Sequence, residues 1–210
     1  MPLFKTIPVT GGLIGIWQLT EKSSDLTTGF SSKELENHSF KQYTYEKRQV
    51  EWLATRLLLR QMIGSDFTIS YSETGKPILD HSRFKHLSIS HSRYFVAVFV
   101  HEQLNIGIDI EDLTRNYIQI EKRYLSEKEL ITVNKNPKLQ CLYWCAKEAI
   151  FKLIPHDGVE FREQMHISPF DPDLDDRFTG RFTSESEELV FQLYFESFSD
   201  HGLVWVMDNK

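Results

Sequence analysis

The stretch GIDIED, residues 107–112, combines the pattern of a buried strand with acidic residues that such a strand should not carry. Isoleucines alternate along it and form one apolar face, which predicts a β-strand packed into the core of its lobe. These are Ile106, Ile108 and Ile110. Because residues i and i+2 of a strand project to the same side, Asp109 and Glu111 point together to the opposite face.

Asp109 and Glu111 would lie about 7 Å apart at their Cα atoms on this strand. Two such charges in a half-buried site repel, and one of them would become protonated. A hard divalent cation such as Mg²⁺ removes the repulsion, because it takes oxygen ligands. An exposed sheet edge with solvated acids is the competing interpretation, and two residues alone do not decide between them. Asp112 would point to the other face, so it is left out of the site.

A second cluster is WCAKEAIFK, residues 144–152. On a helix, Trp144, Glu148 and Lys152 follow one another at four-residue steps and share roughly one face. An ordinary Glu-to-Lys surface pair would explain two of them, but a solvated face rarely needs a tryptophan. If Glu148 faces the acidic strand, three carboxylates could hold one Mg²⁺ with Lys152 nearby. A metal and a lysine beside acidic residues suit phosphoryl transfer, in which charge on phosphate oxygens must be neutralised.

Weaker signals lie in the first half of the chain. Ser90 and His91, in SISHS, lie at the end of a predicted strand and could donate hydrogen bonds to a phosphate, although a local turn or cap is the favoured explanation for such a pair by itself. Arg48, Arg56 and Arg60 follow one helix opposite its apolar face. Arginine forks bind phosphate, but a solvated helix face has the same pattern. Lys76, in the turn ETGKP, is ambiguous by itself.

The rest of the sequence alternates between long helices and groups of strands. Apolar residues at helical spacing predict a helix over residues 43–63 that ends at Gly64, and a second over 138–154 that ends at Pro155. A short helix is expected between them, with Ser126 as its N-cap and Glu129 as its capping-box partner. Strands are predicted at GLIGIWQLT, FTISYS, HLSIS, YFVAVFVH, HISPF, DRFTGRF, ELVFQLYFE and LVWVM.

This order, a long helix with antiparallel strands, occurs roughly twice and predicts an α+β fold of two similar lobes. We place an N-terminal lobe at residues 1–103 and a C-terminal lobe at 104–210 of one compact unit.

Composition excludes some classes of protein. The formal net charge of −6 disfavours wholesale binding to nucleic acid or to an anionic membrane. No apolar run is long enough to cross a bilayer, and the first residues lack the features of a signal peptide, so we expect a cytoplasmic protein. Cys141 and Cys145 lie one helical turn apart and are expected to be reduced core residues, not a disulfide or a metal site.

Taken together, these motifs resemble one family, the 4′-phosphopantetheinyl transferases of the long, two-lobed type, which activate carrier proteins of peptide, polyketide and fatty acid synthesis. The resemblance covers roughly the middle half of the chain. Its most specific part is GIDIE followed at this separation by WCAKEAIFK. Family members often continue with a Gly-rich stretch, where this chain reads LIPHDGVEF. In chain order the motifs are the pair Arg48 and Arg56, GKP (75–77), SISHS (88–92), GIDIE (107–111) and W-x-x-KEA-x-x-K (144–152).

The resemblance implies a pseudo-twofold α+β fold, in which each lobe has an antiparallel sheet packed with a long helix and the active site lies in the cleft between the lobes. It implies Mg²⁺ ligands at Asp109, Glu111 and Glu148, and coenzyme A as co-substrate. Glu148 and Lys152 would be catalytic, with Glu148 the general base, whereas the role of Lys147 is left open. The positions that would contact coenzyme A are Arg48, Arg56, Lys76, Ser90, His91 and Lys152.

The implied reaction is that of a holo-[acyl-carrier-protein] synthase. A serine hydroxyl of an apo acyl or peptidyl carrier protein attacks the β-phosphate of coenzyme A, takes the phosphopantetheine arm and releases 3′,5′-ADP. A monomer is expected. A non-catalytic coenzyme A-binding protein is the first alternative. The second is a Mg²⁺-dependent nuclease, disfavoured because Glu148 and Lys152 are four apart on a helix and the net charge is negative.

Overall fold

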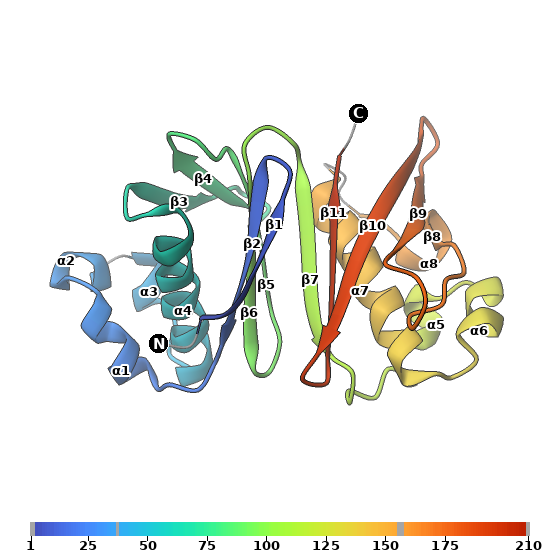
Figure 1. Ribbon diagram of the computed structural model, residues 1–210, viewed down its shortest axis with the longest axis horizontal. Helices are drawn as coiled ribbons and strands as arrows, with labels where there is room; N and C mark the ends of the chain where they lie inside the picture. Colours follow the sequence, from blue (N-terminus) through green and yellow to red (C-terminus); the bar gives the residue numbers. More distant parts are fainter. Residues whose placement is uncertain (1–2, 37, 155–157, 209–210) are drawn as a thin grey trace.

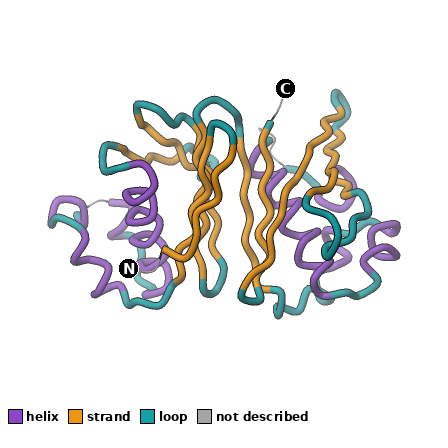
Figure 2. Tube along the Cα trace, in the orientation of Figure 1, coloured by secondary structure: helices purple, strands orange, loops and turns teal. Residues whose placement is uncertain are grey.

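Antiparallel sheets, each backed by one long helix, form the framework of the computed structural model (Figure 1). The structure describes residues 3–36, 38–154 and 158–208. The larger sheets lie next to each other at the centre, and helices cover their outer faces, so the layers run helix, sheet, sheet, helix (Figure 2). The protein therefore has the predicted α+β fold of two lobes.

The N-terminal lobe contains a four-stranded sheet and a helix, α4 (Glu46–Ile63), that packs on its outer face. The sheet order is β1 (Leu3–Val9), β2 (Gly12–Gln18), β6 (Phe95–His101) and β5 (His86–His91). A separate hairpin pairs β3 (Phe67–Tyr71) with β4 (Pro77–His81). The short elements are α1 (Ser23–Leu26), η1 (Thr27–Gly29), α2 (Ser32–Leu35) and α3 (His38–Lys41).

The C-terminal lobe repeats this arrangement with a five-stranded sheet and the long helix α7 (Pro137–Leu153). Its sheet order is β7 (Ile106–Asp112), β11 (His201–Met207), β10 (Glu188–Phe198), β9 (Arg177–Thr183) and β8 (Met165–Ile167). The short helices are α5 (Glu121–Tyr124), α6 (Glu127–Val133) and α8 (Phe161–Gln164). The chain passes from one sheet to the other between β6 and β7, while the division at residue 103 into two lobes stays a prediction.

Strand β7 lies between the two lobes and is covered on both faces. Its isoleucines pack against β2 and β6 of the N-terminal lobe, for example against Ile14 and Phe99. The expectation that this apolar face packs the core of its own lobe is therefore wrong, because the two sheets stack face to face. The other face of β7 meets α7, so residues 106–110 are all buried. Gly107 allows this close approach, because an added Cβ atom would overlap the backbone oxygen of Ala149.

The seam between the lobes is closed by serine hydroxyls of β5. The Oγ atoms of Ser88 and Ser90 accept hydrogen bonds from the backbone N–H groups of Ile108 and Ile110, at 3.2 and 3.3 Å. Both contacts join residues twenty apart, so β5 and β7 run in the same direction. Serine side chains thus take the place of the carbonyl acceptors that a continuous sheet would use.

Several local predictions are confirmed. The first long helix ends at Gly64, whose φ of 85° suits a glycine, and Ser126 and Glu129 form the predicted capping box of α6. Strands β1 and β4 were not predicted. Pro155, expected to end the second long helix, lies outside the described residues. None of the helices that the structure describes has both the length and the apolar character to span a bilayer.

Replacing Gly107 tests the close packing of β7 on α7. Gly107→Ala places a methyl group against the Ala149 carbonyl, and we expect it to lower the free energy of unfolding by about 3 kcal/mol. Gly29→Ala is the control, because its new methyl group would meet only the flexible side chain of Leu57, at 2.8 Å. Urea unfolding measures both variants. Equal stability of Gly107→Ala and wild type would contradict the packing argument.

Candidate active site

Asp109 lies at the junction of the two lobes and α7. Its side chain is buried, and the residue is 5% exposed. The Oδ1 atom accepts one hydrogen bond from Ser90 Oγ on β5 and one from Lys152 Nζ on α7, each at 2.7 Å. Lys152 also donates to the carbonyl oxygen of Ile108, at 2.9 Å. The structure therefore brings together three of the predicted site residues, from β5, β7 and α7.

The second oxygen of Asp109 is available for a ligand. Oδ2 is buried and accepts no hydrogen bond from the residues that the structure describes. Leaving a buried carboxylate oxygen without a partner costs free energy, so Oδ2 is expected to gain a partner when a ligand binds. A cation bound there would satisfy it.

Glu111 and Glu148 share this environment. Glu111 Oε1 accepts from Arg115 Nη1 at 2.8 Å and from Trp144 Nε1 at 3.2 Å. Burial raises the pKa of Glu111, and the charge of Asp109 raises it further. Burial likewise raises the pKa of Glu148 to about 7, with contributions from Asp109 and Glu111. These acids repel one another in a site that is largely closed to water.

The donor set fits a hard divalent cation. Carboxylate oxygens are its preferred ligands, and a cation would relieve the repulsion among Asp109, Glu111 and Glu148. As the side chains stand, Lys152 pairs with Asp109 and Arg115 pairs with Glu111. Within the described ranges no three acidic, histidine or cysteine side chains are grouped closely enough to ligate an ion. Holding a metal would therefore require these side chains to turn toward one another.

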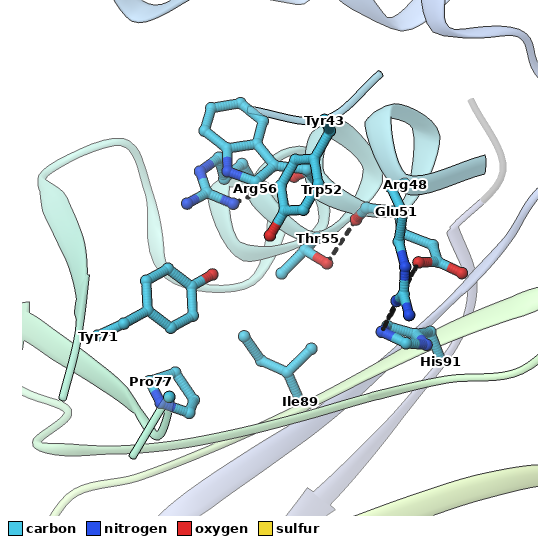
Figure 3. Close-up of a pocket in the computed structure, with 11 residues that line it drawn as sticks. Tyr43, Arg48, Glu51, Trp52, Thr55, Arg56, Tyr71, Pro77, Ile89 and His91 are labelled. Atoms are coloured by element: carbon cyan, nitrogen blue, oxygen red, sulfur yellow. Dashed lines mark hydrogen bonds and ion pairs between the residues drawn. The ribbon is translucent and has the colours of Figure 1, made fainter. Parts of the chain in front are cut away.

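A basic cavity of about 230 Å³ lies beside α4 in the N-terminal lobe (Figure 3). Arg48, Arg56 and His91 all line it, as predicted for residues that contact phosphate. Arg56 is 9% exposed and stacks on Trp52, with its Cζ atom 3.5 Å from the ring centroid. The interpretation of these arginines as a solvated helix face is therefore wrong for Arg56. Its buried guanidinium is suited to an anion that enters the cavity.

Lys76 does not line the same cavity as the arginines. It lies with Lys152 and Phe151 on a larger cavity of about 530 Å³. The two cavities share Gly75, Pro77 and Ile89, so they adjoin along the β4–β5 wall. The predicted cationic residues thus follow one continuous path from α4 to α7. A long anionic ligand could occupy both cavities.

Glu148 lines a third cavity, of about 580 Å³, with Arg115, Trp144 and Phe161. Phe161 is the last residue of LIPHDGVEF, the segment singled out in the sequence because it replaces a Gly-rich stretch. Residues 155–157 of this segment lie outside the described residues. Lys147 has no place in any of these cavities. It is buried and pairs with Glu129 of α6 at 2.8 Å, so its role is to hold the short helices onto α7.

Other site residues were missed from the sequence. Glu51 lines the basic cavity and is buried, although it follows Arg48 by only three positions on a helix. Its position seven residues before the buried Leu58 is a signal that could have revealed this. Trp52 stacks under Arg56 at a separation of four residues, which is also readable from the sequence. Arg115 lies beyond the GIDIED motif, and only the structure shows its ion pair with Glu111.

Comparison with known proteins gives two matches. Residues 105–204 match the family model of the 4′-phosphopantetheinyl transferase superfamily, and they include the acidic strand and all of α7. The 4′-phosphopantetheinyl transferase Sfp of Bacillus subtilis (strain 168) is 34% identical over 98 residues, which are 44% of this chain and 43% of that protein. The chain therefore matches less than half of the length of this curated relative.

The raised pKa of Glu148 predicts a pH dependence of stability. The acid is protonated in the folded chain up to about pH 7, whereas its ordinary value is 4.5. Its contribution is therefore complete below pH 4.5 and is lost as the pH rises through about 7. In metal-free buffer we expect Glu148→Gln to exceed wild type in free energy of unfolding by about 1–3 kcal/mol at pH 8, and by less at pH 5. Chemical denaturation across this range measures the difference.

The control for this experiment is Glu188→Gln, because Glu188 is an exposed residue of β10. It should show no such pH-dependent gain. Equal stabilities of Glu148→Gln and wild type at pH 8 would refute the proposed repulsion among the acids.

Proposed function

Since residues 105–204 belong to the 4′-phosphopantetheinyl transferase superfamily, we propose that this protein transfers the 4′-phosphopantetheine arm of coenzyme A to a serine of an apo carrier protein. The products are a holo acyl or peptidyl carrier protein and 3′,5′-ADP. The observation that carries the proposal is the Ser90–Asp109–Lys152 contact, in which the family's acidic strand and lysine meet at the lobe junction. The protein would then be a holo-[acyl-carrier-protein] synthase.

Mg²⁺ is the proposed metal, held by Asp109, Glu111 and Glu148. Two observations support this assignment: Asp109 Oδ2 accepts no hydrogen bond from the described residues, and the pKa values of both glutamates are raised. When bound, the ion would neutralise charge on the pyrophosphate oxygens of coenzyme A. Lys152 would supply a second positive charge at the lobe junction, where its ammonium group contacts Asp109.

The chain's own basic residues would hold the rest of the coenzyme. Arg48, Arg56 and His91 line the first cavity and can donate hydrogen bonds to a phosphate. Lys76 lies on the adjoining cavity, where it would meet the adenosine part. Ser90 is bound to Asp109, so its contact with a phosphate would be made beside the acidic strand. These positions extend the site from α4 to α7.

Glu148 is the proposed general base. Its pKa is about 7 without a metal, and a bound cation would lower it, so Glu148 would be ionised in the loaded site and could take the proton of the serine hydroxyl directly or through water. Trp144 and Phe161 line the cavity beside it and give that cavity an apolar wall. We further propose that the protein acts as a cytoplasmic monomer.

A mass-shift assay tests the function. Wild type, coenzyme A, Mg²⁺ and an apo carrier protein should give a carrier whose mass has increased by one phosphopantetheine group. Asp109→Asn and Lys152→Ala should each lower the rate at least about 100-fold, because charge on the transferred phosphate is then left uncompensated. Lys138→Ala is the control, since Lys138 lies at the far end of α7 and pairs with Asp173.

The outcomes separate the alternatives. No mass shift over a panel of carriers, with coenzyme A still bound, would favour a non-catalytic coenzyme A-binding protein. Cleavage of DNA that requires Mg²⁺ and Asp109 would instead favour the nuclease.

Metal binding can be tested without any substrate. Mg²⁺ should raise the melting temperature of wild type, because a ligand at a hundred times its Kd stabilises by about 2.7 kcal/mol. The rise should be larger at pH 8 than at pH 6, since Glu148 must be ionised to bind the ion. Asp109→Asn should abolish the rise and Lys138→Ala should retain it. A rise of the same size in Asp109→Asn would place the ion elsewhere.

A further inference from the structure

Glu51 is a buried carboxylate in a cavity whose other charged groups are basic. The residue is 3% exposed and lines the cavity beside Arg48, Arg56 and His91 (Figure 3). A negative charge at this place repels an incoming phosphate, and its burial is unfavourable unless it is paired. Packing alone does not explain an acid here, since α4 buries leucines on the same side. The pattern points to a role in arranging the basic groups.

The contacts of Glu51 define that role. Its Oε2 atom accepts a hydrogen bond from Arg48 Nη1 at 2.9 Å and lies 3.7 Å from His91 Nε2. Arg48 Nη1 is in turn 3.1 Å from His91 Nε2. The side chains of Arg48 and His91 are 54% and 38% exposed, so two solvent-accessible groups converge on one buried acid. Lys47 Nζ approaches the other oxygen, Oε1, at 3.6 Å.

This geometry fixes where the proton of His91 lies. Arginine has donors but no acceptor, so the contact between Arg48 Nη1 and His91 Nε2 requires an unprotonated Nε2. The imidazole is then neutral, with its proton on Nδ1. Partial burial lowers the pKa of His91, Glu51 opposes that effect, and Arg48 lowers the pKa further. The charged groups that face His91 are Arg48 and Glu51 from α4 and Lys152 from α7.

A phosphate in the cavity would change this balance. Its negative charge attracts Arg48 and favours an imidazolium, which can donate from Nε2 to a phosphate oxygen. Once Arg48 turns toward the phosphate, Glu51 is left 3.7 Å from His91 Nε2 and can pair with the new positive charge. The proton comes from solvent, which His91 reaches through its exposed side.

We propose that Glu51 is a positioning residue that orients Arg48 and His91 toward a phosphate of coenzyme A and stabilises the proton that His91 takes up on binding. The proposal rests on the proposed function for the identity of the ligand. Binding of a phosphate in the basic cavity would then be coupled to the uptake of a proton by His91. Glu51 would support this coupling without contacting the phosphate itself.

Calorimetry of the wild-type protein tests the proton. Binding of 3′,5′-ADP is measured in metal-free solution at about pH 7.5, in buffers that differ in ionisation enthalpy, so that the proton uptake can be obtained. We expect wild type to take up more protons than His91→Asn, by a difference that approaches about one per ligand. Protons taken up or released by the phosphate itself or by Glu148 are the same in both proteins and cancel in this difference. Equal uptake by the two proteins would overturn the proposal.

Variants of Glu51 test the positioning. Glu51→Gln keeps the shape but loses the charge, and it should bind 3′,5′-ADP roughly ten-fold more weakly, with proton uptake reduced toward that of His91→Asn. In the transfer assay its KM for coenzyme A should rise while kcat changes little. Glu51→Asp should recover part of the affinity and of the proton uptake. Glu36→Gln, at an exposed acid of the same lobe, should behave as wild type.

These experiments distinguish an incorrect role for Glu51 from an incorrect proposed function. If wild type transfers the phosphopantetheine arm but Glu51→Gln keeps wild-type affinity and proton uptake, the role of Glu51 is wrong and the transferase stands. If wild type neither binds 3′,5′-ADP nor modifies a carrier, the function itself fails. Melting curves establish that Glu51→Gln is folded. If it is not, the comparison of wild type with His91→Asn still decides whether binding is coupled to a proton.

Discussion

The burial of the Asp109 carboxylate is the constraint on which the lobe junction and the candidate site both depend. One of its oxygens accepts hydrogen bonds from Ser90 on β5 and from Lys152 on α7, so a single atom joins a strand of each lobe to the long helix. A desolvated charge is stable only with such partners, and loss of either would leave it uncompensated. The same dependence on positive charge makes the lobe junction suitable for a cation.

The candidate site is partly separated into a basic end and an acidic end, although each end also carries charge of the other sign. Arg48, Arg56 and His91 line a cavity of the N-terminal lobe, whereas Glu111 and Glu148 stand with α7 in the C-terminal lobe. The net charge of −6 conceals this separation, because local field and not total charge decides which ligand a cavity accepts. A molecule with phosphates along its length suits such a site when a divalent cation covers the acidic end.

Some short-range patterns were read correctly from the sequence, and others were not. The capping box of Ser126 and Glu129 joins residues within one turn, so their spacing in the sequence was enough to predict it. Strands β1 and β4 escaped prediction because the polarity of their side chains does not follow their alternating burial: Lys5 lies on the partly buried face of β1, and Ile78 lies on the exposed face of β4. Arg56 is buried because Trp52 of the same helix covers it, against the usual preference of arginine for water.

The sequence by itself determined which side chains share a face. The two-residue period of β7 places Asp109 beside Glu111, and the helical period of α7 places Glu148 near Lys152. Only the tertiary structure decided what each face meets: the isoleucines meet the other lobe, the acids meet α7, and Glu51 lies under Arg48 and His91. The physical reason is that periodicity is a property of the local backbone. Contacts between distant residues depend instead on how whole layers stack, and no single segment carries that information.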